Sequence, residues 1–296
     1  MPPVPLVVSG LCLSDMRQNY TWRLPGGSLP LGSRTAIMGI LNVTPDSFSD
    51  GGLYIDPQKA VDRGKEMEAE GADIIDIGGE SSRPGSDAVS EDEELRRVLP
   101  VLEGITRSVK IPISIDTYRA NVARRAIEAG AQIVNDISSF RFDAQMPCIV
   151  SRTGVGVVLM HSRGDRDTLH KQSPMANALN DVEVDLSSAA ASAVAAGIPV
   201  DSIVLDPGIG FGKAAAESVS ILKNLNRFSK IGYPLLIGTS RKSFIRLLTS
   251  DQTQDGRIWG TAATVVTAIL NGAHIVRVHD VRHTRILADV TDRLRT

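Results

Sequence analysis

Short runs of β-branched and aliphatic residues recur along the chain, and each ends in a polar or glycine-rich cluster. Between several of them lie longer stretches with helical patterning, such as 57–70, 119–129 and 182–196, each followed directly by a glycine. Glycine in that position ends a helix, because it readily adopts a left-handed backbone. The eight runs are residues 36–42, 74–80, 113–116, 133–136, 157–161, 203–206, 235–238 and 275–279.

Strands that alternate with helices predict right-handed βαβ crossovers and a parallel sheet. Eight such units in about 250 residues fit a closed barrel better than an open sheet. An open Rossmann sheet would need a glycine fingerprint after its first strand, whereas the first run here leads into Asn-Val-Thr-Pro-Asp. We therefore predict an α/β fold with a single (β/α)8 TIM barrel over residues 36–296.

Residues 1–35 form an N-terminal extension to the predicted barrel. Two half-apolar runs flank Pro25, Gly26 and Gly27 in this segment. Because strands joined by such a turn pair as a hairpin, we predict a hairpin that plugs the bottom of the barrel.

Composition and charge exclude several classes of protein. Hydrophobic residues make up 42% of the 296 residues and the net charge is −2, so a sizeable core is expected and wholesale disorder is not. The chain has no block of Lys and Arg that would grip nucleic acid or an anionic membrane. It also has no apolar run of the roughly 20 residues that a membrane span needs.

The cysteines and the N-terminus indicate the compartment. Cys12 and Cys148 are the only cysteines and show no framework spacing, which predicts free thiols in a reducing environment. The mildly apolar stretch 5–13 lacks a preceding Lys or Arg and is soon followed by Asp15, so it makes a poor signal peptide. We expect a cytoplasmic protein.

Unusual polar residues fall at or just past the C-terminal ends of the predicted strands. In a barrel these ends form one rim, where such enzymes build their active sites. A carboxylate at the end of a buried strand is costly unless it is paired or used. The residues are Asn42, Asp76, Asp116, Asn135, His161, Asp206, Ser240, Arg277 and His279.

Each of these residues also has an ordinary structural explanation. Asp116 precedes a predicted helix and can serve as its N-cap, and Asn135 with the next residue can form a simple turn. Asp76 fits a structural partner inside the barrel mouth as well as a ligand contact. His161 is more typical of a satisfied rim histidine than of a ligand. His279 and His283 stand four residues apart, but no third His, Cys or Glu lies at zinc spacing, so a zinc site is not expected.

Seven segments, taken in order, resemble motifs of the dihydropteroate synthase family. Together they cover roughly residue 37 to the C-terminus, and a chance match of seven ordered motifs is far rarer than that of one short motif. The segments are NVTPDSFSDGG (42–52), GGESSRPGS (78–86), SIDT (114–117), VNDI (134–137), LDPGIGFGK (205–213), GTSRKS (238–243) and RVHD (277–280).

The resemblance implies a transferase of folate biosynthesis, a class of sulfonamide targets. It would condense 6-hydroxymethyl-7,8-dihydropterin diphosphate with p-aminobenzoate to give 7,8-dihydropteroate and diphosphate. The carboxylate of Asp206 suits the paired N–H donors of a pterin. That of Asp116 suits the positive charge that develops when the C–O bond breaks. The implied pterin-binding residues are Asp116, Asn135, Met160, Asp206, Phe211, Gly238 and Lys242.

The same resemblance implies sites for diphosphate, metal and p-aminobenzoate. Mg²⁺ is the implied cofactor, bound through Asn42, and a helix opening at 240–243 would offer free N–H groups to the p-aminobenzoate carboxylate. The catalytic residues would be Asp116, Lys242 and Arg277. The diphosphate-binding residues would be Asn42, Arg83, Arg277 and His279. The p-aminobenzoate-binding residues would be Phe48, Ser82, Pro84, Phe211, Gly212, Ser240 and Lys242.

Two other functions share part of this pattern. A methyltetrahydrofolate methyltransferase would keep the Asp and Asn residues but needs no diphosphate site. Asn42, Arg83 and Arg277 indicate such a site here and therefore argue against a methyltransferase. A homologue that only binds pterin would be expected to have lost Asp116 or Lys242. By analogy with the family we expect small-molecule substrates and a homodimer.

Overall fold

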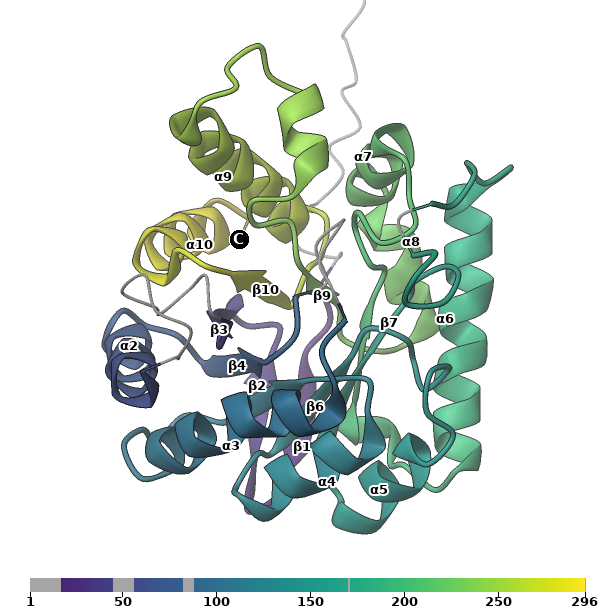
Figure 1. Ribbon diagram of the computed structural model, residues 1–296. Helices are drawn as coiled ribbons and strands as arrows, with labels where there is room; N and C mark the ends of the chain where they lie inside the picture. The colour runs from purple at the N-terminus through teal and green to yellow at the C-terminus, as the bar shows by residue number, and fades with distance from the viewer. Residues whose placement is uncertain (1–16, 45–55, 82–87, 170, 296) are drawn as a thin grey trace, which may run out of the picture.

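The computed structural model describes residues 17–44, 56–81, 88–169 and 171–295. Eight parallel strands pair in the order β8-β7-β6-β5-β4-β3-β10-β9. A parallel bridge between Leu205 and Leu235 joins the two ends of this sheet, so the strands close into a barrel (Figure 1). The strands are β3 (Ala36–Asn42), β4 (Ile74–Gly78), β5 (Ile113–Asp116), β6 (Ile133–Asp136), β7 (Gly156–Met160), β8 (Ile203–Asp206), β9 (Leu236–Ile237) and β10 (Ile275–Val278).

Helices cover the outside of the barrel (Figure 1). They turn small and aliphatic residues inward, as α4 does with Val122, Ala123 and Ala126. No helix in the described parts of the chain is long and apolar enough to cross a bilayer. The helices are α2 (Pro57–Ala69), α3 (Glu91–Thr106), α4 (Ala120–Glu128), α5 (Met146–Thr153), α6 (Ala178–Ala195), α7 (Ala215–Lys223), α8 (Leu225–Phe228), α9 (Gln254–Leu270) and α10 (Val281–Arg295), with 3-10 turns η2 (Val200–Ser202), η3 (Ser229–Ile231) and η4 (Ser243–Leu247).

The predicted barrel is confirmed, with small shifts at element ends. The run 74–80 forms a strand only to Gly78, because the chain turns into the rim loop there. The helix predicted at 182–196 starts earlier, at Ala178. Its first turn is capped by the Asn177 side chain, which accepts a hydrogen bond from the N–H of Asn180, and a polar cap extends a helix beyond its apolar stripe.

The predicted hairpin closes the lower end of the barrel. Strands β1 (Tyr20–Leu24) and β2 (Gly27–Leu31) pair as antiparallel neighbours. Trp22 is fully buried and donates a hydrogen bond from Nε1 to the carbonyl of Ser202 at 2.9 Å. It packs in one apolar cluster with the first residues of several barrel strands, among them Ile74, Ile133 and Ile275. The amino-terminal end of the barrel is therefore sealed by side chains.

We predict that Trp22→Ala lowers the free energy of unfolding by about 3–5 kcal/mol, because it empties the centre of this plug. Thr21 on the same strand is exposed, so Thr21→Ala should change the free energy of unfolding by no more than about 0.5 kcal/mol. Urea denaturation of both variants checks this. Equal stability of the two would show that the hairpin does not support the barrel.

Candidate active site

The polar residues at the carboxyl ends of the strands lie side by side because the strands are parallel and in register. Asn42 on β3 is the register partner of Gly78 on β4, and Gly78 is in turn the partner of Asp116 on β5. Asp116 pairs with Asn135 on β6. Strand pairing alone thus places an amide, a carboxylate and a second amide along one rim of the barrel.

Arg277 on β10, the strand next to β3, reaches two carboxylates of this row. Its Nε donates to Asp76 at 2.6 Å, and its Nη2 donates to Asp116 at 2.6 Å. Asp76 is fully buried and also accepts a hydrogen bond from Asn135 at 3.1 Å. Burial pulls the pKa of Arg277 down, but the two carboxylates outweigh it and hold that pKa above its ordinary value. Asp76 therefore orients Arg277 and Asn135 through Oδ2, whereas its buried Oδ1 has no hydrogen-bond partner among the described residues.

Both carboxylates predicted to face the pterin have raised pKa values. Burial raises the pKa of Asp116 to about 7, against the attraction of Arg277 and with the repulsion of Asp76. Burial likewise raises the pKa of Asp206 to about 6, although its Oδ1 accepts a hydrogen bond from the N–H of Gly208 at 2.7 Å. Because the ionised forms cost free energy here, each depends on its neighbouring cations and donors.

An apolar wall stands beside these carboxylates. Met160 and Phe211 pack together with Ile137 and Leu169 in one buried cluster. The ammonium of Lys242 lies 3.6 Å from the centroid of the Phe211 ring, a cation–π contact. The charge of Lys242 also favours the ionised forms of Asp116 and Asp206. The rim thus combines an apolar wall with carboxylates and cations, which suits a flat polar ring.

The loop after β9 differs in part from its prediction. The N–H of Lys242 donates to the carbonyl of Thr239 at 3.2 Å, and that of Arg241 donates to the hydroxyl of Thr261 at 3.1 Å. The prediction of free N–H groups here is therefore wrong for these two residues, because the chain forms a tight turn before η4 rather than opening an α-helix. The hydroxyl of Ser240 stays at the rim, 2.9 Å from Nδ1 of His279.

The structure separates the functional and ordinary explanations of other rim residues. Helix α4 takes its N-cap at Arg119, so Asp116 is not a cap. Asp136 forms the turn after β6 by accepting hydrogen bonds from the N–H groups of Ser138 and Phe140. The side chain of Asn135 takes no part in that turn and donates a hydrogen bond to Asp76 instead.

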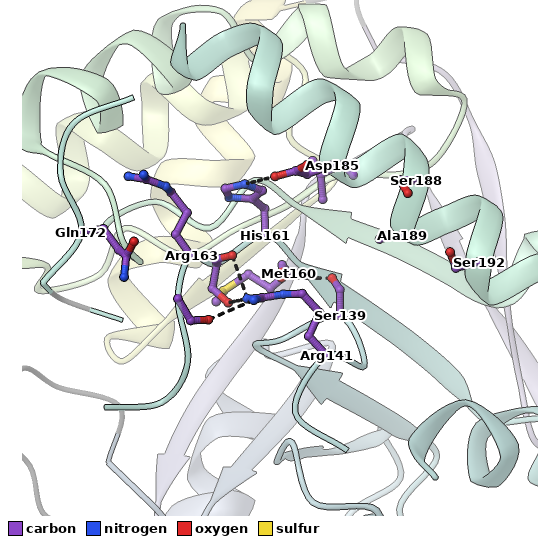
Figure 2. A pocket seen from close by; sticks show the side chains of 13 residues that line it. Ser139, Arg141, Met160, His161, Arg163, Gln172, Asp185, Ser188, Ala189 and Ser192 are labelled. Atoms are coloured by element: carbon purple, nitrogen blue, oxygen red, sulfur yellow. Dashed lines mark hydrogen bonds and ion pairs between the residues drawn. The ribbon is translucent and has the colours of Figure 1, made fainter. Parts of the chain in front are cut away.

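His161 is a rim histidine whose side chain points toward α6. Its Nε2 lies 3.1 Å from the carboxylate of Asp185 on α6, as Figure 2 shows. Burial lowers the pKa of His161 to about 2, so the ring is neutral. It borders a cavity of about 460 Å³ between α6 and the loops that follow β6 and β7.

The remaining predicted residues are only partly placed. Phe48, Ser82, Arg83 and Pro84 lie outside the described residues. Gly238 lies against Arg277, since a Cβ built on it would sit 3.8 Å from that of the arginine. Gly212 follows Phe211 in the glycine-rich loop after β8.

Sequence reasoning gave no definite role to Asp76 or Lys213. A carboxylate inside a buried strand is the signal that marks Asp76. Lys213 ends a glycine-rich segment directly after a strand, and its contacts depend on a loop shape that the sequence does not reveal.

A closed parallel barrel with this rim defines an enzyme that holds a flat, polar heterocycle. Residues 38–279 match the family described as "Pterin binding enzyme". The chain is 48% identical to dihydropteroate synthase of Bacillus subtilis over 88% of each protein. It is 43% identical to that of Synechocystis over 89% of this chain and 91% of the relative.

A solved structure of Xanthomonas albilineans dihydropteroate synthase with 4-aminobenzoic acid superposes with a TM-score of 0.87 at 38% identity, covering 94% of this chain and 99% of that one. The chain belongs to the dihydropteroate synthase family.

The network around Arg277 leads to a prediction about stability. Arg277→Met leaves the buried Asp76 and the partly buried Asp116 without their cation and should destabilise the fold by about 3–5 kcal/mol at about pH 8. Asp116 already binds its proton more tightly in the folded state than in the unfolded one, and losing Arg277 strengthens this. Lowering the pH to about 5.5 therefore protonates Asp116 in the native variant and should shrink the loss.

Urea denaturation at both pH values measures the effect. Arg124→Met, which removes an exposed ion pair with Glu128 on α4, is the control and should cost less than about 1 kcal/mol at either pH. A loss for Arg277→Met that does not change with pH would contradict the electrostatic explanation.

Proposed function

We propose that the rim around Arg277 carries out the dihydropteroate synthase reaction in this chain. The substrates are 6-hydroxymethyl-7,8-dihydropterin diphosphate and p-aminobenzoate, and the products are 7,8-dihydropteroate and diphosphate. The observation that carries the proposal is the placement of Asp116, Asp206 and Lys242 around the apolar wall of Phe211. Structures of Xanthomonas albilineans dihydropteroate synthase described with 4-aminobenzoic acid and with 7,8-dihydropteroate support the substrate class.

Pterin recognition is assigned to the row of rim residues. Asp206 accepts hydrogen bonds from the amino group and the adjacent ring N–H of the pterin edge, and Asn135 offers both a donor and an acceptor. Lys242 donates to the pterin carbonyl and ring nitrogen. Met160 and Phe211 pack against the ring faces, which is consistent with their shared apolar cluster.

The chemical step replaces a C–O bond by a C–N bond. As the bond from the pterin methylene to diphosphate breaks, positive charge spreads over the ring, and ionised Asp116 stabilises it more in the transition state than in the ground state. The amine of p-aminobenzoate is already neutral near pH 7, so its lone pair attacks the methylene without a base. The proton then leaves the new secondary amine, and diphosphate carries away the bonding pair. Arg277 keeps Asp116 ionised for this step.

Mg²⁺ and diphosphate are assigned to the neighbouring part of the rim. Oδ1 of Asn42 and Oδ2 of Asp116 both lie near Gly78, 3.8 Å and 3.6 Å from the position that a Cβ on this glycine would take. Among the described residues no group of three or more His, Cys, Asp or Glu could hold a metal. Mg²⁺ retains waters and takes few protein ligands, so Asn42 can be its one protein ligand. When bound, the ion would neutralise charge on the departing diphosphate, beside Arg277 and His279.

A homodimer is proposed from apolar side chains exposed on neighbouring elements. Helix α9 packs against both η4 and α10. Trp259 is 71% exposed and Leu294 is 75% exposed, and covering such residues favours association. The large exposed apolar residues of these elements, with the residue that follows η4, are Leu247, Leu248, Trp259, Ile286, Val290 and Leu294.

We also propose that the enzyme works in the cytoplasm. Cys148 is a free, exposed thiol, which suits a reducing compartment. Fractionation of source cells followed by an activity assay tests this, and activity outside the cytoplasmic fraction would contradict it.

The test of function is diphosphate release from the pterin diphosphate in the presence of p-aminobenzoate and Mg²⁺. We expect release that depends on both substrates. Asp206→Ala should weaken binding of the pterin diphosphate by about 2–4 kcal/mol, because two buried donors of the ligand lose their acceptor. Calorimetry that finds the same affinity in variant and wild type would overturn the assignment of Asp206.

A second prediction separates the role of Asp116 from binding. Asp116→Asn keeps the shape but removes the charge, so kcat should fall about 100-fold with a smaller loss of pterin affinity. The wild-type kcat/KM should fall as the pH drops through about 7, where Asp116 takes up its proton. The variant should lack this step in its pH profile. Equal losses in kcat and affinity would instead show that Asp116 stabilises the bound substrate and the transition state to the same extent.

A third prediction concerns the dimer. The double variant Trp259→Arg, Leu294→Glu should sediment as a monomer, because charges replace the apolar surface. Val184→Asp changes an exposed apolar residue on α6, away from this surface, and should remain dimeric. Analytical ultracentrifugation measures both, and a monomeric wild type would contradict the proposal.

A further inference from the structure

Lys213 places a buried ammonium group behind the proposed pterin site. Its Nζ donates hydrogen bonds to the carbonyls of Gly208 at 2.9 Å, Phe211 at 3.1 Å and His161 at 3.1 Å. The first two belong to the loop after β8, and the third follows β7. Because an ammonium has three N–H donors and no acceptor, these contacts use its whole hydrogen-bonding capacity. The pattern fits a cation that holds backbone in place.

The loop that Lys213 holds has little stiffness of its own. Gly208, Gly210 and Gly212 all have left-handed backbones, with φ of +67°, +80° and +65°. A Cβ on Gly208 would sit 1.9 Å from the carbonyl oxygen of His161, so this loop packs closely against the end of β7. Glycine loses more conformational freedom on ordering than other residues, and the loop shape therefore depends on contacts made from outside.

The atoms that Lys213 fixes are the ones that shape the pterin site. Gly208, whose carbonyl binds the ammonium, donates its N–H to Asp206 at 2.7 Å. Phe211, whose carbonyl also binds the ammonium, carries the ring beneath Lys242. His161 follows Met160, another member of the apolar wall, and Figure 2 shows the side chain of His161 directed toward Asp185. One cation thus connects the pterin carboxylate to both sides of the wall.

We propose that Lys213 is a positioning residue for the pterin ring: its ammonium holds the loop after β8 against β7, so that Asp206 and Phe211 are set before the substrate arrives. The inference rests on the proposed function, since it concerns the same pterin site. Lys213 itself touches no reacting atom.

The positioning depends on the charge of Lys213. A neutral amine would have only two N–H donors, and its lone pair would face a carbonyl oxygen. Burial lowers the pKa of Lys213 to about 7; Asp206 and Glu217 oppose this, while Lys242 and Arg163 add to it. Pterin binding then requires a proton on Lys213, so affinity falls as the pH rises above about 7. This trend is opposite to that of Asp206, which must lose a proton to bind.

The experiment measures binding of 6-hydroxymethyl-7,8-dihydropterin by calorimetry at several pH values, together with KM and kcat for the pterin diphosphate. Lys213→Met removes the donors and the charge, and Lys213→Arg keeps a charge that does not titrate. Lys223→Met replaces an exposed lysine on the following helix and is the matched control. Circular dichroism checks the folding of each variant.

We expect Lys213→Met to weaken pterin binding and raise its KM about 10-fold or more, with a much smaller change in kcat. Lys213→Arg should recover part of the affinity. Protonation of the ligand itself affects all the proteins equally. If wild type loses affinity above about pH 7 and Lys213→Arg does not, the loss is therefore due to deprotonation of Lys213. Lys223→Met should match wild type throughout.

Other outcomes overturn the inference or the function separately. Unchanged pterin affinity in Lys213→Met, or a fall in unfolding temperature without a change in KM, makes Lys213 merely structural. If Lys213→Met does not fold, the comparison of wild type with Lys213→Arg decides. The same pH dependence of pterin affinity in these two proteins overturns the inference. A wild type that neither binds the pterin nor releases diphosphate refutes the proposed function instead.

Discussion

The proposed reaction depends on ionised carboxylates at the mouth of an apolar barrel. Burial raises the pKa values of Asp116 and Asp206 into the range where enzymes work, so the charge that the chemistry uses is not given by residue type alone. The positive charges of Arg277 and Lys242 favour the ionised form of these carboxylates. Asp76 and Asp116 accept hydrogen bonds from Arg277 and hold it in place. Cations, carboxylates and amides from separate strands are therefore one electrostatic unit, in which each group sets the protonation of its neighbours.

The two ends of the barrel have different roles: the amino-terminal end is packed with apolar side chains, and the carboxyl-terminal end carries the polar rim. At the lower end the hairpin inserts Trp22 among aliphatic residues, with its one polar atom satisfied by Ser202. At the upper end buried polar groups are brought together at a cost, which only a tightly held scaffold can support. The burial of Trp22 in the hairpin contributes stability that offsets part of this cost.

Much of this architecture could be predicted from the sequence, because alternating apolar runs specify a parallel barrel and strand ends specify its rim. Asp116, Asn135, Asp206 and Arg277 were placed in that way. What the sequence did not reveal depends on three-dimensional contacts. The pairing of Arg277 with Asp76 joins strands far apart in the chain, and the backbone N–H groups at 241 and 242 are taken up by a local turn.

The left-handed loop after β8 has a consequence for variation in this family of drug targets. Where Gly208 and Gly212 approach neighbouring residues closely, any side chain would collide with His161 or Arg163. A single substitution there cannot reshape the pocket without disrupting the loop that forms it. An inhibitor that rests mainly on this backbone would meet a surface that point mutation has little freedom to alter, unlike one that relies on exchangeable side chains.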